Sequence, residues 1–380
     1  MAIRPDARAW VEVDLDSLRA NYATLRRVVK AGTALLPMVK ADAYGLGAER
    51  VVRALEPFDP LGYGVATAAE GAALRAAGIV RPILVATPIP EGDVDVAAAA
   101  RLTASISSVE GLERWTAAGR RQGGAPLEFH VEVDTGMGRC GFDWRDTGQW
   151  TEALRGRLGS AARWTGVFTH FHSADAPDAR LCAAQWERFR DTLVQLPVSR
   201  EDLLVHAANS AAALRFPEFA GDLVRPGIFL YGGHPAPAVE GVPAPAAVAT
   251  LRARIGLIRE VPPGSTLGYG ATHVARSWER WGTLSIGYGD GLPRSLGNAA
   301  DALVGGVRVP VIGRVSMDLT VVELGAVPDA AVGDVATLIG RDGEEWITLD
   351  EVASRAGTIG YEILTGLGSR LPRIERNGGR

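Results

Sequence analysis

Lysine is nearly absent from this chain, which makes its few lysines informative. Among the 40 basic residues of the 380-residue sequence, only Lys30 and Lys40 are lysines. Arginine keeps its proton near neutral pH, whereas a lysine amine can lose its proton and form a Schiff base with a carbonyl compound. Lys30 follows a run of charged helical residues, so we expect it to be solvated. Lys40 directly follows the apolar segment 35–39, which makes it the candidate for Schiff-base chemistry.

Other side chains that could take part in catalysis follow short apolar segments farther along the chain. They include two arginines, a histidine, and acidic and amide groups. A glycine among them could let its backbone N–H approach a phosphate. In chain order these residues are Glu132, Asp134, Arg139, His170, Asn209, Ser210, Arg225, Gly227 and Ile228. Ser210 begins a predicted helix, and its position allows either a helix cap or an anion contact. Together with Lys40, the set predicts a site for a small anionic ligand.

Alternating apolar and helical segments indicate how these residues could meet. We predict eight strands, at 35–39, 62–66, 82–86, 102–106, 128–133, 166–169, 203–206 and 223–228, and helices such as 49–55, 68–77, 109–121 and 181–196. Eight β-then-α units are typical of a (β/α)₈ barrel, in which the carboxyl ends of the strands surround one site. A doubly wound open sheet is the alternative. It normally has a glycine-rich turn after its first strand, where this chain has Val39-Lys40-Ala41-Asp42.

A proline-rich linker at 235–245 precedes a segment with a different pattern. There a period near two predicts strands at 247–259, 281–286, 302–311, 320–324, 334–339 and 346–348, and a single short helix near 349–356. The predicted fold class is therefore α/β, with a (β/α)₈ barrel over residues 1–240 and a mostly β domain over residues 241–380.

Composition narrows the class of protein. A net charge of -4 disfavours nucleic acid as the main partner, and 47% hydrophobic residues allow sizeable cores. The N-terminus lacks the apolar core of a signal peptide, and no apolar run of about 18 residues follows. Cys140 and Cys182 cannot make a disulfide framework, and no cysteine–histidine spacing matches a zinc site. We therefore expect a cytoplasmic protein without a membrane span or a bound metal.

Nine short motifs occur in an order that points to one family. The segments are 39–47, 130–139, 169–171, 209–212, 224–228, 268–272, 286–291, 313–318 and 361–364. Over nearly its whole length the chain thereby resembles the bacterial alanine racemases, which are pyridoxal-phosphate-dependent enzymes of fold type III. The resemblance implies a barrel followed by a β domain and a head-to-tail homodimer with shared active sites.

The resemblance also implies a mechanism with two bases. Lys40 would carry pyridoxal 5′-phosphate and act on one face of the substrate. Tyr269 of the other subunit would act on the opposite face, because racemisation removes a proton from one face and returns it to the other. A free tyrosine has a pKa of about 10, so positive neighbours must stabilise its phenolate. The resemblance assigns that task to His170 and Arg225, with Arg225 donating to the pyridine nitrogen of the cofactor.

The remaining contacts follow from the same resemblance. The phosphate contacts would be Tyr44, Ser210, Gly227, Ile228 and Tyr361. The substrate carboxylate would bind Arg139 and the backbone of Met317. The supporting residues would be Glu132, Asn209, Tyr288 and Asp318, the last two lining the entrance from the partner subunit. The implied substrate is alanine, supplying D-alanine for peptidoglycan. Serine would be rejected by only roughly 1–3 kcal/mol.

One position departs from a common pattern of the family. Seven residues before Arg139, many members have a carbamylated lysine that holds the arginine in place, whereas this chain has Glu132. We hypothesise that the Glu132 carboxylate orients Arg139 without requiring CO₂. The alternative is that Glu132 pairs with another nearby arginine.

Three other classes of protein share parts of this plan. Fold-type III decarboxylases of basic amino acids use a partner cysteine where the racemases use tyrosine, and neither cysteine of this chain lies in the second domain. Non-catalytic pyridoxal-phosphate carriers consist of the barrel alone. A racemase of broader or serine specificity is the remaining alternative.

Overall fold

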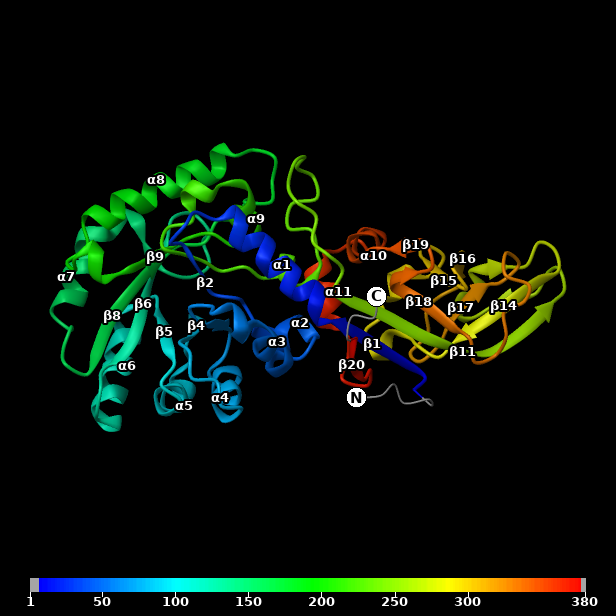
Figure 1. The fold of residues 1–380 in the computed structure, drawn as a ribbon, viewed down its shortest axis with the longest axis horizontal. Coiled ribbons are helices and arrows are strands. Elements are labelled where there is room, and N and C mark those ends of the chain that lie inside the picture. Colours follow the sequence, from blue (N-terminus) through cyan, green and yellow to red (C-terminus); the bar gives the residue numbers. More distant parts are fainter. Residues whose placement is uncertain (1–6, 377–380) are drawn as a thin grey trace.

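The computed structural model describes residues 7–376, which form an elongated molecule with two parts (Figure 1). A barrel of strands and helices occupies one end, and a mostly β domain occupies the other. The segment 235–248, between them in the chain, contains no helix or strand. Among the described residues, no helix is both long and apolar enough to cross a membrane.

Eight parallel strands form the barrel. They are β2 (Ala34–Leu35), β3 (Tyr63–Val65), β4 (Ile83–Pro88), β5 (Thr103–Ile106), β6 (Leu127–Asp134), β8 (Ala162–Phe168), β9 (Leu204–His206) and β10 (Leu223–Val224). The order β3-β4-β5-β6-β8-β9 is continuous, and β10 pairs with β2. Backbone bonds close the ring, from the Gly64 N–H to the Pro37 oxygen (2.9 Å) and from the Asp222 N–H to the Val205 oxygen (2.7 Å). The predicted barrel is confirmed. The short strand β7 (Phe142–Asp143) adds to β6.

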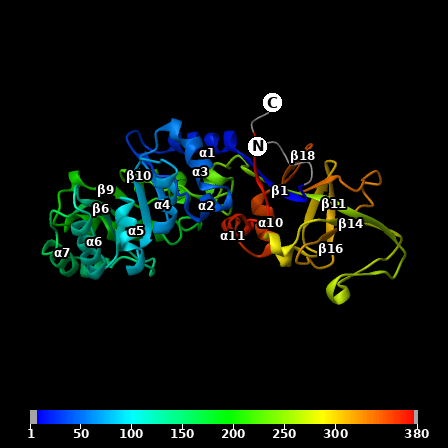
Figure 2. The ribbon, with the colours of Figure 1, turned by 90° about the horizontal axis from the view of Figure 1, so that it is seen from below.

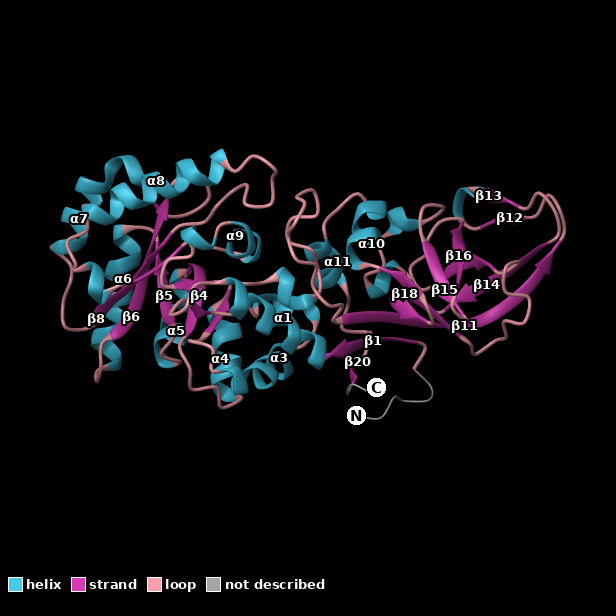
Figure 3. Cartoon of the chain, turned by 45° about the horizontal axis from the view of Figure 1, so that its top comes forward, coloured by secondary structure: helices cyan, strands magenta, loops and turns pink. Residues whose placement is uncertain are grey.

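Helices surround the barrel strands (Figure 3). They are α1 (Leu15–Val28), α3 (Ala48–Leu55), α4 (Ala68–Ala76), α5 (Val94–Ala99), α6 (Val109–Gln122), α7 (Thr147–Arg155), α8 (Arg180–Val194) and α9 (Ser210–Arg215). Polar residues cap several of them, as Thr67 and Glu70 do in the capping box of α4. Strands β3 and β5 are buried at every position, as expected where helices cover the outside of a parallel sheet.

The β domain is built on a nine-stranded sheet, in the order β19-β18-β15-β16-β17-β14-β11-β1-β20. Its strands are β1 (Ala9–Asp14), β11 (Ala249–Val261), β14 (Glu279–Leu284), β15 (Asp301–Val304), β16 (Val307–Ile312), β17 (Thr320–Glu323), β18 (Val335–Asp342), β19 (Glu345–Ile347) and β20 (Arg373–Arg376). The first strand of the chain lies antiparallel to β11 and parallel to β20, so both ends of the described chain join this sheet.

Two sequence predictions for this domain were wrong. The strand expected at 302–311 is the hairpin β15–β16, because Gly305 and Gly306 both adopt positive φ and turn the chain. A second helix, α11 (Gly360–Gly366), follows α10 (Leu349–Ala356), whereas the sequence indicated only one.

An arm projects from the β domain at the end far from the barrel (Figures 2 and 3). It contains the ends of β11 and β14 and, between them, the short strands β12 (Thr266–Leu267) and β13 (His273–Val274). Tyr269 lies between β12 and β13 in the sequence. The arm therefore carries the expected second base away from the barrel of its own chain.

Candidate active site

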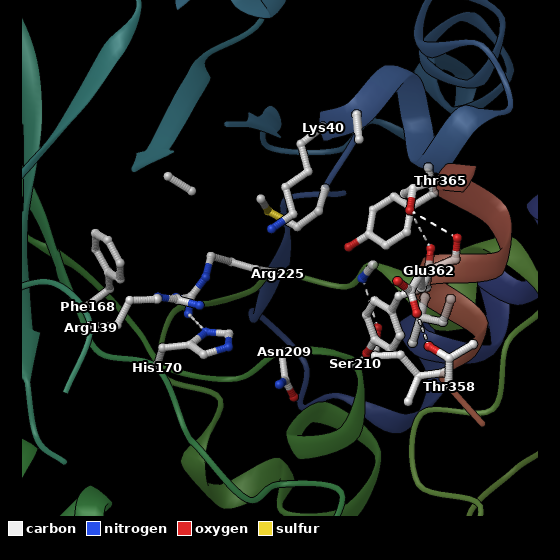
Figure 4. Close-up of a pocket in the computed structure, with 18 of the residues that line it drawn as sticks. Lys40, Arg139, Phe168, His170, Asn209, Ser210, Arg225, Thr358, Glu362 and Thr365 are labelled. Atoms are coloured by element: carbon white, nitrogen blue, oxygen red, sulfur yellow. Dashed lines mark hydrogen bonds between the residues drawn. The ribbon is translucent and has the colours of Figure 1, made fainter. Parts of the chain in front are cut away.

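A cavity of about 630 Å³ lies at the carboxyl ends of the barrel strands. Helix α11 of the β domain contributes to its wall (Figure 4). The cavity brings together eleven of the residues singled out from the sequence: Lys40, Tyr44, Glu132, Arg139, His170, Asn209, Ser210, Arg225, Gly227, Ile228 and Tyr361. Their convergence follows from the barrel, because they lie at or after the carboxyl ends of β2, β6, β8, β9 and β10 or on the helix that covers the opening.

Lys40 begins a tight turn, α2 (Lys40–Gly45), which follows β2 after the connecting residues 36–39. The four residues after it, Ala41–Tyr44, have φ between 52° and 55°, which is the left-handed region. Such residues each cost roughly 1–2 kcal/mol, so outside contacts must support the turn. One is the bond from the Ala41 N–H to Oε1 of Glu70 (2.6 Å), and another is the bond from the Ala48 N–H to Oδ1 of Asp42 (2.7 Å).

The Lys40 amine points into the cavity toward Arg225 (Figure 4). Burial lowers the pKa of Lys40, and the nearby guanidinium of Arg139 lowers it further. Both effects disfavour the ammonium form. The neutral amine, which is the form that acts as nucleophile and base, is thereby favoured relative to that of an exposed lysine.

Arg225 is held in a chain of buried rings. Its Nη1 lies 2.5 Å from Nδ1 of His206, and Nε2 of His206 lies 2.9 Å from Nδ1 of His130. Its Nη2 donates to the Thr169 oxygen (2.9 Å) and lies 3.3 Å from Nδ1 of His170. Burial lowers the pKa of Arg225 to about 10, so the guanidinium still carries its charge at neutral pH.

His170 is neutral in this arrangement. Burial and the charge of Arg225 lower its pKa to about 3. Because Arg225 is a donor only, Nδ1 of His170 must accept, and the proton of the imidazole sits on Nε2. The family resemblance implied that both residues act as positive neighbours of a phenolate. In the structure Arg225 carries that charge, and His170 can only relay it through a hydrogen bond.

The opposite wall of the cavity is a backbone cradle. Asn209 caps α9, because its Oδ1 accepts the Ala212 N–H (3.0 Å), and this leaves Ser210 free for another role. Ser210 is 2% exposed, and its Oγ accepts the Gly227 N–H (2.8 Å). Within residues 7–376 no acceptor is recorded for the buried Ile228 N–H. A free amide beside a hydroxyl at a helix N-terminus favours an anion.

Close packing sets the shape of this cradle. A Cβ on Gly227 would lie 2.2 Å from Oη of Tyr44. The Tyr44 ring stacks on Tyr231, with centroids 4.6 Å apart, and lies 6.0 Å from the Tyr361 ring. The Tyr231 hydroxyl in turn donates to the Met38 oxygen (2.8 Å). Two hydroxyls, of Tyr44 and Tyr361, are thereby brought to the same wall as Gly227.

Glu132 is buried in the same cavity wall region as two arginines, Arg139 and Arg225. Its Oε2 accepts a hydrogen bond from Ser107 (3.1 Å), and no ion pair to Arg139 is found among the described residues. Burial raises the pKa of Glu132, while the charges of Arg225 and Arg139 lower it. Its carboxylate therefore acts on both arginines at longer range than direct contact.

Asp134, singled out from the sequence, lies outside this cavity, and its carboxylate accepts the Gly136 N–H (2.8 Å). The four residues expected from the β domain also lie outside it. Tyr269 is 71% exposed, Met317 53% and Tyr288 42%, and all three belong to the β domain. Asp318 is also exposed and pairs with Arg370 at 2.6 Å. A single chain does not bring them to Lys40.

Several cavity residues were not foreseen from the sequence. They are Met38, Ala41, Ala86, Phe168, Thr358, Ile359, Glu362 and Thr365. The Phe168 ring lies under the Arg225 guanidinium, 5.1 Å from its central carbon, which supports a cation–π contact. Thr358 donates to Glu362 one turn later, at the start of α11. If a helix had been predicted around Tyr361, it would have pointed to Glu362, the next residue, and to Thr365, which lies one helical turn after Tyr361.

Comparison with known proteins decides the family. The family model described as "Alanine racemase, N-terminal domain" matches residues 13–235, and that described as "Alanine racemase, C-terminal domain" matches residues 248–375. The chain belongs to the alanine racemase family. It is accordingly an amino-acid racemase, an isomerase, and the decarboxylase alternative drawn from the sequence is set aside.

Individual relatives of the alanine racemase family match over nearly the full length. The alanine racemase of Geobacillus kaustophilus is 40% identical over 368 residues, covering 96% of this chain and 94% of the relative. The solved alanine racemase of Streptomyces coelicolor is 37% identical, with a TM-score of 0.90 and coverage of 98% and 99%. That of Bacillus anthracis, solved with bound L-Ala-P, is 32% identical with a TM-score of 0.90, covering 98% of this chain and 96% of that one.

Proposed function

We propose that this racemase interconverts L- and D-alanine, with pyridoxal 5′-phosphate attached to Lys40 and with each active site shared by two subunits of a homodimer. The observation that carries the proposal is the cavity itself. A lysine amine with a lowered pKa faces a buried arginine on one side and an anion cradle on the other. The proposed setting is the cytoplasm, where the D-alanine formed would serve peptidoglycan synthesis.

The residues present fit pyridoxal phosphate. The free Ile228 amide, the Ser210 hydroxyl and the space next to Gly227 match a phosphate, and the Tyr44 and Tyr361 hydroxyls add two possible donors. Arg225 faces the same cavity as the Lys40 amine and would donate to the ring nitrogen without protonating it. When bound, the cofactor withdraws electrons from the substrate Cα and so makes the α-proton more acidic.

Lys40 serves as the base on one face. Lys40 is partly buried and close to Arg139, and both effects lower the pKa of its amine and favour the neutral form. A neutral Nζ can accept the α-proton from one side of the substrate and return a proton to that side in the reverse direction.

Tyr269 of the partner subunit serves as the base on the other face. Its exposure on a projecting arm, outside the cavity of its own chain, supports a role in another subunit. A free tyrosine is ionised only to about one part in a thousand at neutral pH. The Arg225 charge, relayed by neutral His170, would favour its phenolate.

Arg139 and the backbone of Met317 would bind the substrate carboxylate. Arg139 lines the cavity, and a guanidinium can bind a carboxylate through two parallel hydrogen bonds. Within the described residues the Met317 N–H has no recorded acceptor, so it can donate to a ligand. A small pocket with these walls suits alanine. Serine would be disfavoured by only roughly 1–3 kcal/mol and is the second candidate substrate.

Incubation with a panel of L-amino acids in D₂O, followed by chiral separation and mass measurement, tests the reaction and the substrate together. Deuterium at Cα with inversion for alanine, and much slower inversion for serine, is expected. Equal rates for both would assign a broader racemase instead.

Lys40→Ala tests the attachment of the cofactor. We expect borohydride treatment of the native enzyme to fix the cofactor on the peptide that contains Lys40. The variant should show no such adduct and should lose racemisation by at least about 10²-fold. Lys30→Ala is the matched control, and it should retain both the covalent adduct and the racemisation activity. A covalent adduct in Lys40→Ala would refute the assignment.

A further inference from the structure

A buried carboxylate underlies the face of the β domain that carries Tyr288 and Met317. Asp290 is 0% exposed, and Arg8 binds it through two bonds, Nη2 to Oδ1 (2.5 Å) and Nη1 to Oδ2 (3.0 Å). Arg370 approaches Oδ1 through Nε (3.2 Å), and the Gly287 N–H donates to Oδ2 (3.1 Å). The charge of Asp290 is therefore compensated by two guanidinium groups, as a buried carboxylate requires.

The series of ion pairs around Asp290, called here the Asp290 array, continues to the surface loop at 316–319. Arg370 also donates through Nη2 to Oδ1 of Asp318 (2.6 Å), giving the alternating series Arg8–Asp290–Arg370–Asp318. Removing one charge from such a series leaves its neighbour unpaired. A defect at Asp290 is therefore expected to reach Asp318 through Arg370.

Backbone contacts connect the Asp290 loop to Met317 directly. The Tyr288 N–H donates to the Ser316 oxygen (3.0 Å), and the Gly289 N–H donates to the Met317 oxygen (2.7 Å). A Cβ on Gly287 would lie 2.2 Å from the Ser316 oxygen, so the two loops touch without a gap. The position of the Met317 peptide is thus set by the loop that Asp290 holds, while the Tyr288 and Met317 side chains stay exposed.

We propose that Asp290 is a positioning residue for substrate binding, which acts through the contact between Gly289 and Met317 and serves the active site of the partner subunit. It does not touch the substrate. It fixes the Met317 N–H in the place where the proposed function, on which this inference rests, uses that group to bind the substrate carboxylate. A misplaced donor weakens a contact made in both the ground state and the transition state, so KM changes more than kcat.

Asp290→Asn removes the charge with little change of shape. We expect KM for alanine to rise about tenfold and kcat to stay within about twofold of the native value. Asp95→Asn is the matched control, because Asp95 forms an exposed pair with Arg121 on the barrel at 2.6 Å. It should leave both constants unchanged. If Asp290→Asn does not fold, Arg370→Gln supplies the same comparison. Native constants in the folded variant, or equal losses in kcat and kcat/KM, would overturn the proposal.

Heterodimers separate the two subunits' contributions. We would co-express two differently tagged chains, Lys40→Ala with Asp290→Asn, and purify the mixed dimer. One site then combines both defects, whereas the other has native Lys40 and a native Asp290 loop. We expect the native KM and about half the native turnover per dimer. A raised KM in the mixed dimer would show that Asp290 acts within its own subunit and would overturn the proposal.

A second mixed dimer, of Lys40→Ala with Tyr269→Phe, tests the proposed function itself. If this dimer recovers about half the native turnover but the Lys40→Ala/Asp290→Asn dimer does not show the native KM, only the positioning role of Asp290 is rejected. Failure of the Tyr269 pair to recover rejects the shared active site, and with it the inference built on it.

Discussion

At the scale of single residues, the active-site chemistry depends on how burial distributes charge. Lys40 and His170 are both pushed toward their neutral forms, while Arg225 remains charged despite complete burial. The cavity thus combines an amine of lowered pKa and a neutral imidazole with a fixed positive charge. This combination favours proton transfer at Lys40 and concentrates positive potential where a phenolate would need it.

Tyr269→Phe should separate the two faces of the reaction. Net racemisation should fall by about 10²–10⁴-fold in both directions, because enantiomers have equal free energies and the two directions share one equilibrium. Exchange of the α-proton with D₂O should nevertheless survive for one enantiomer, the one whose proton Lys40 removes. Exchange rates measured separately for L- and D-alanine check this. Equal residual exchange from both enantiomers would contradict the two-base mechanism.

Glu132→Gln tests whether a fixed carboxylate keeps Arg139 in place. The variant retains an acceptor for Ser107 but leaves Arg139 and Arg225 without the nearby negative charge. We expect KM for alanine to rise about 5- to 10-fold. Steady-state kinetics, with and without removal of dissolved CO₂, would measure it, and the native enzyme should be insensitive to CO₂.

Glu128→Gln is the control for the Glu132 substitution. It lies on the same strand, β6, where its carboxylate pairs with Arg163 away from the cavity. Its kinetics should match those of the native enzyme. Unchanged affinity and turnover in Glu132→Gln would contradict an orienting role.

At the scale of elements, the anion cradle depends on two segments that approach without side chains between them. Gly227→Ala would place a methyl group 2.2 Å from the Tyr44 hydroxyl, and Tyr44 cannot retreat because Tyr231 stacks against it. We expect the affinity for pyridoxal phosphate to fall by about 10- to 100-fold, since the phosphate cradle must open. Titration of the apoenzyme with cofactor, followed by absorbance, gives the dissociation constant.

Gly92→Ala is the matched control for this substitution. A Cβ there would meet no atom within 4 Å, and the φ angle of Gly92 is not positive. Its cofactor affinity should be native. Native affinity in Gly227→Ala would mean that the cradle is not the phosphate site.

At the scale of the whole molecule, buried histidines should make the fold sensitive to acid. Burial lowers the pKa of His130 and of His170 to about 3, and that of His206 well below its ordinary value, whereas an unfolded histidine titrates near 6.5. As pH falls from about 6.5 toward 3, the unfolded chain binds protons that the folded chain does not. Stability therefore falls through this window, by up to about 1.4 kcal/mol per pH unit for each histidine.

Denaturant titrations at several pH values would measure this slope. His130→Gln should make the slope shallower by about one proton, whatever its effect on absolute stability. His172→Gln, at an exposed position, should leave the slope unchanged. An identical slope in His130→Gln and the native protein would contradict the prediction.

Much of the architecture was predictable because it depends on local patterns. Apolar periodicity located all eight barrel strands. Lys40, His170 and Arg225 follow the ends of such strands, which placed these three residues at the carboxyl-terminal end of the barrel. The hairpin β15–β16 was missed because an apolar run on both sides of Gly305–Gly306 reads as one strand. Helix α11 was missed because its seven residues are too few for a clear helical period.

The sequence by itself determined which residues could do chemistry and that they would meet, because side-chain type and strand position are local properties. Only the tertiary structure decided the charge state of His170, the capping of α9 by Asn209 and not by Ser210, and the pairing of β1 with strands from the other end of the chain. These outcomes depend on burial and on contacts between residues far apart in sequence. The Asp290 array has the same origin, since Arg8, Asp290 and Arg370 are adjacent only after the sheet has formed.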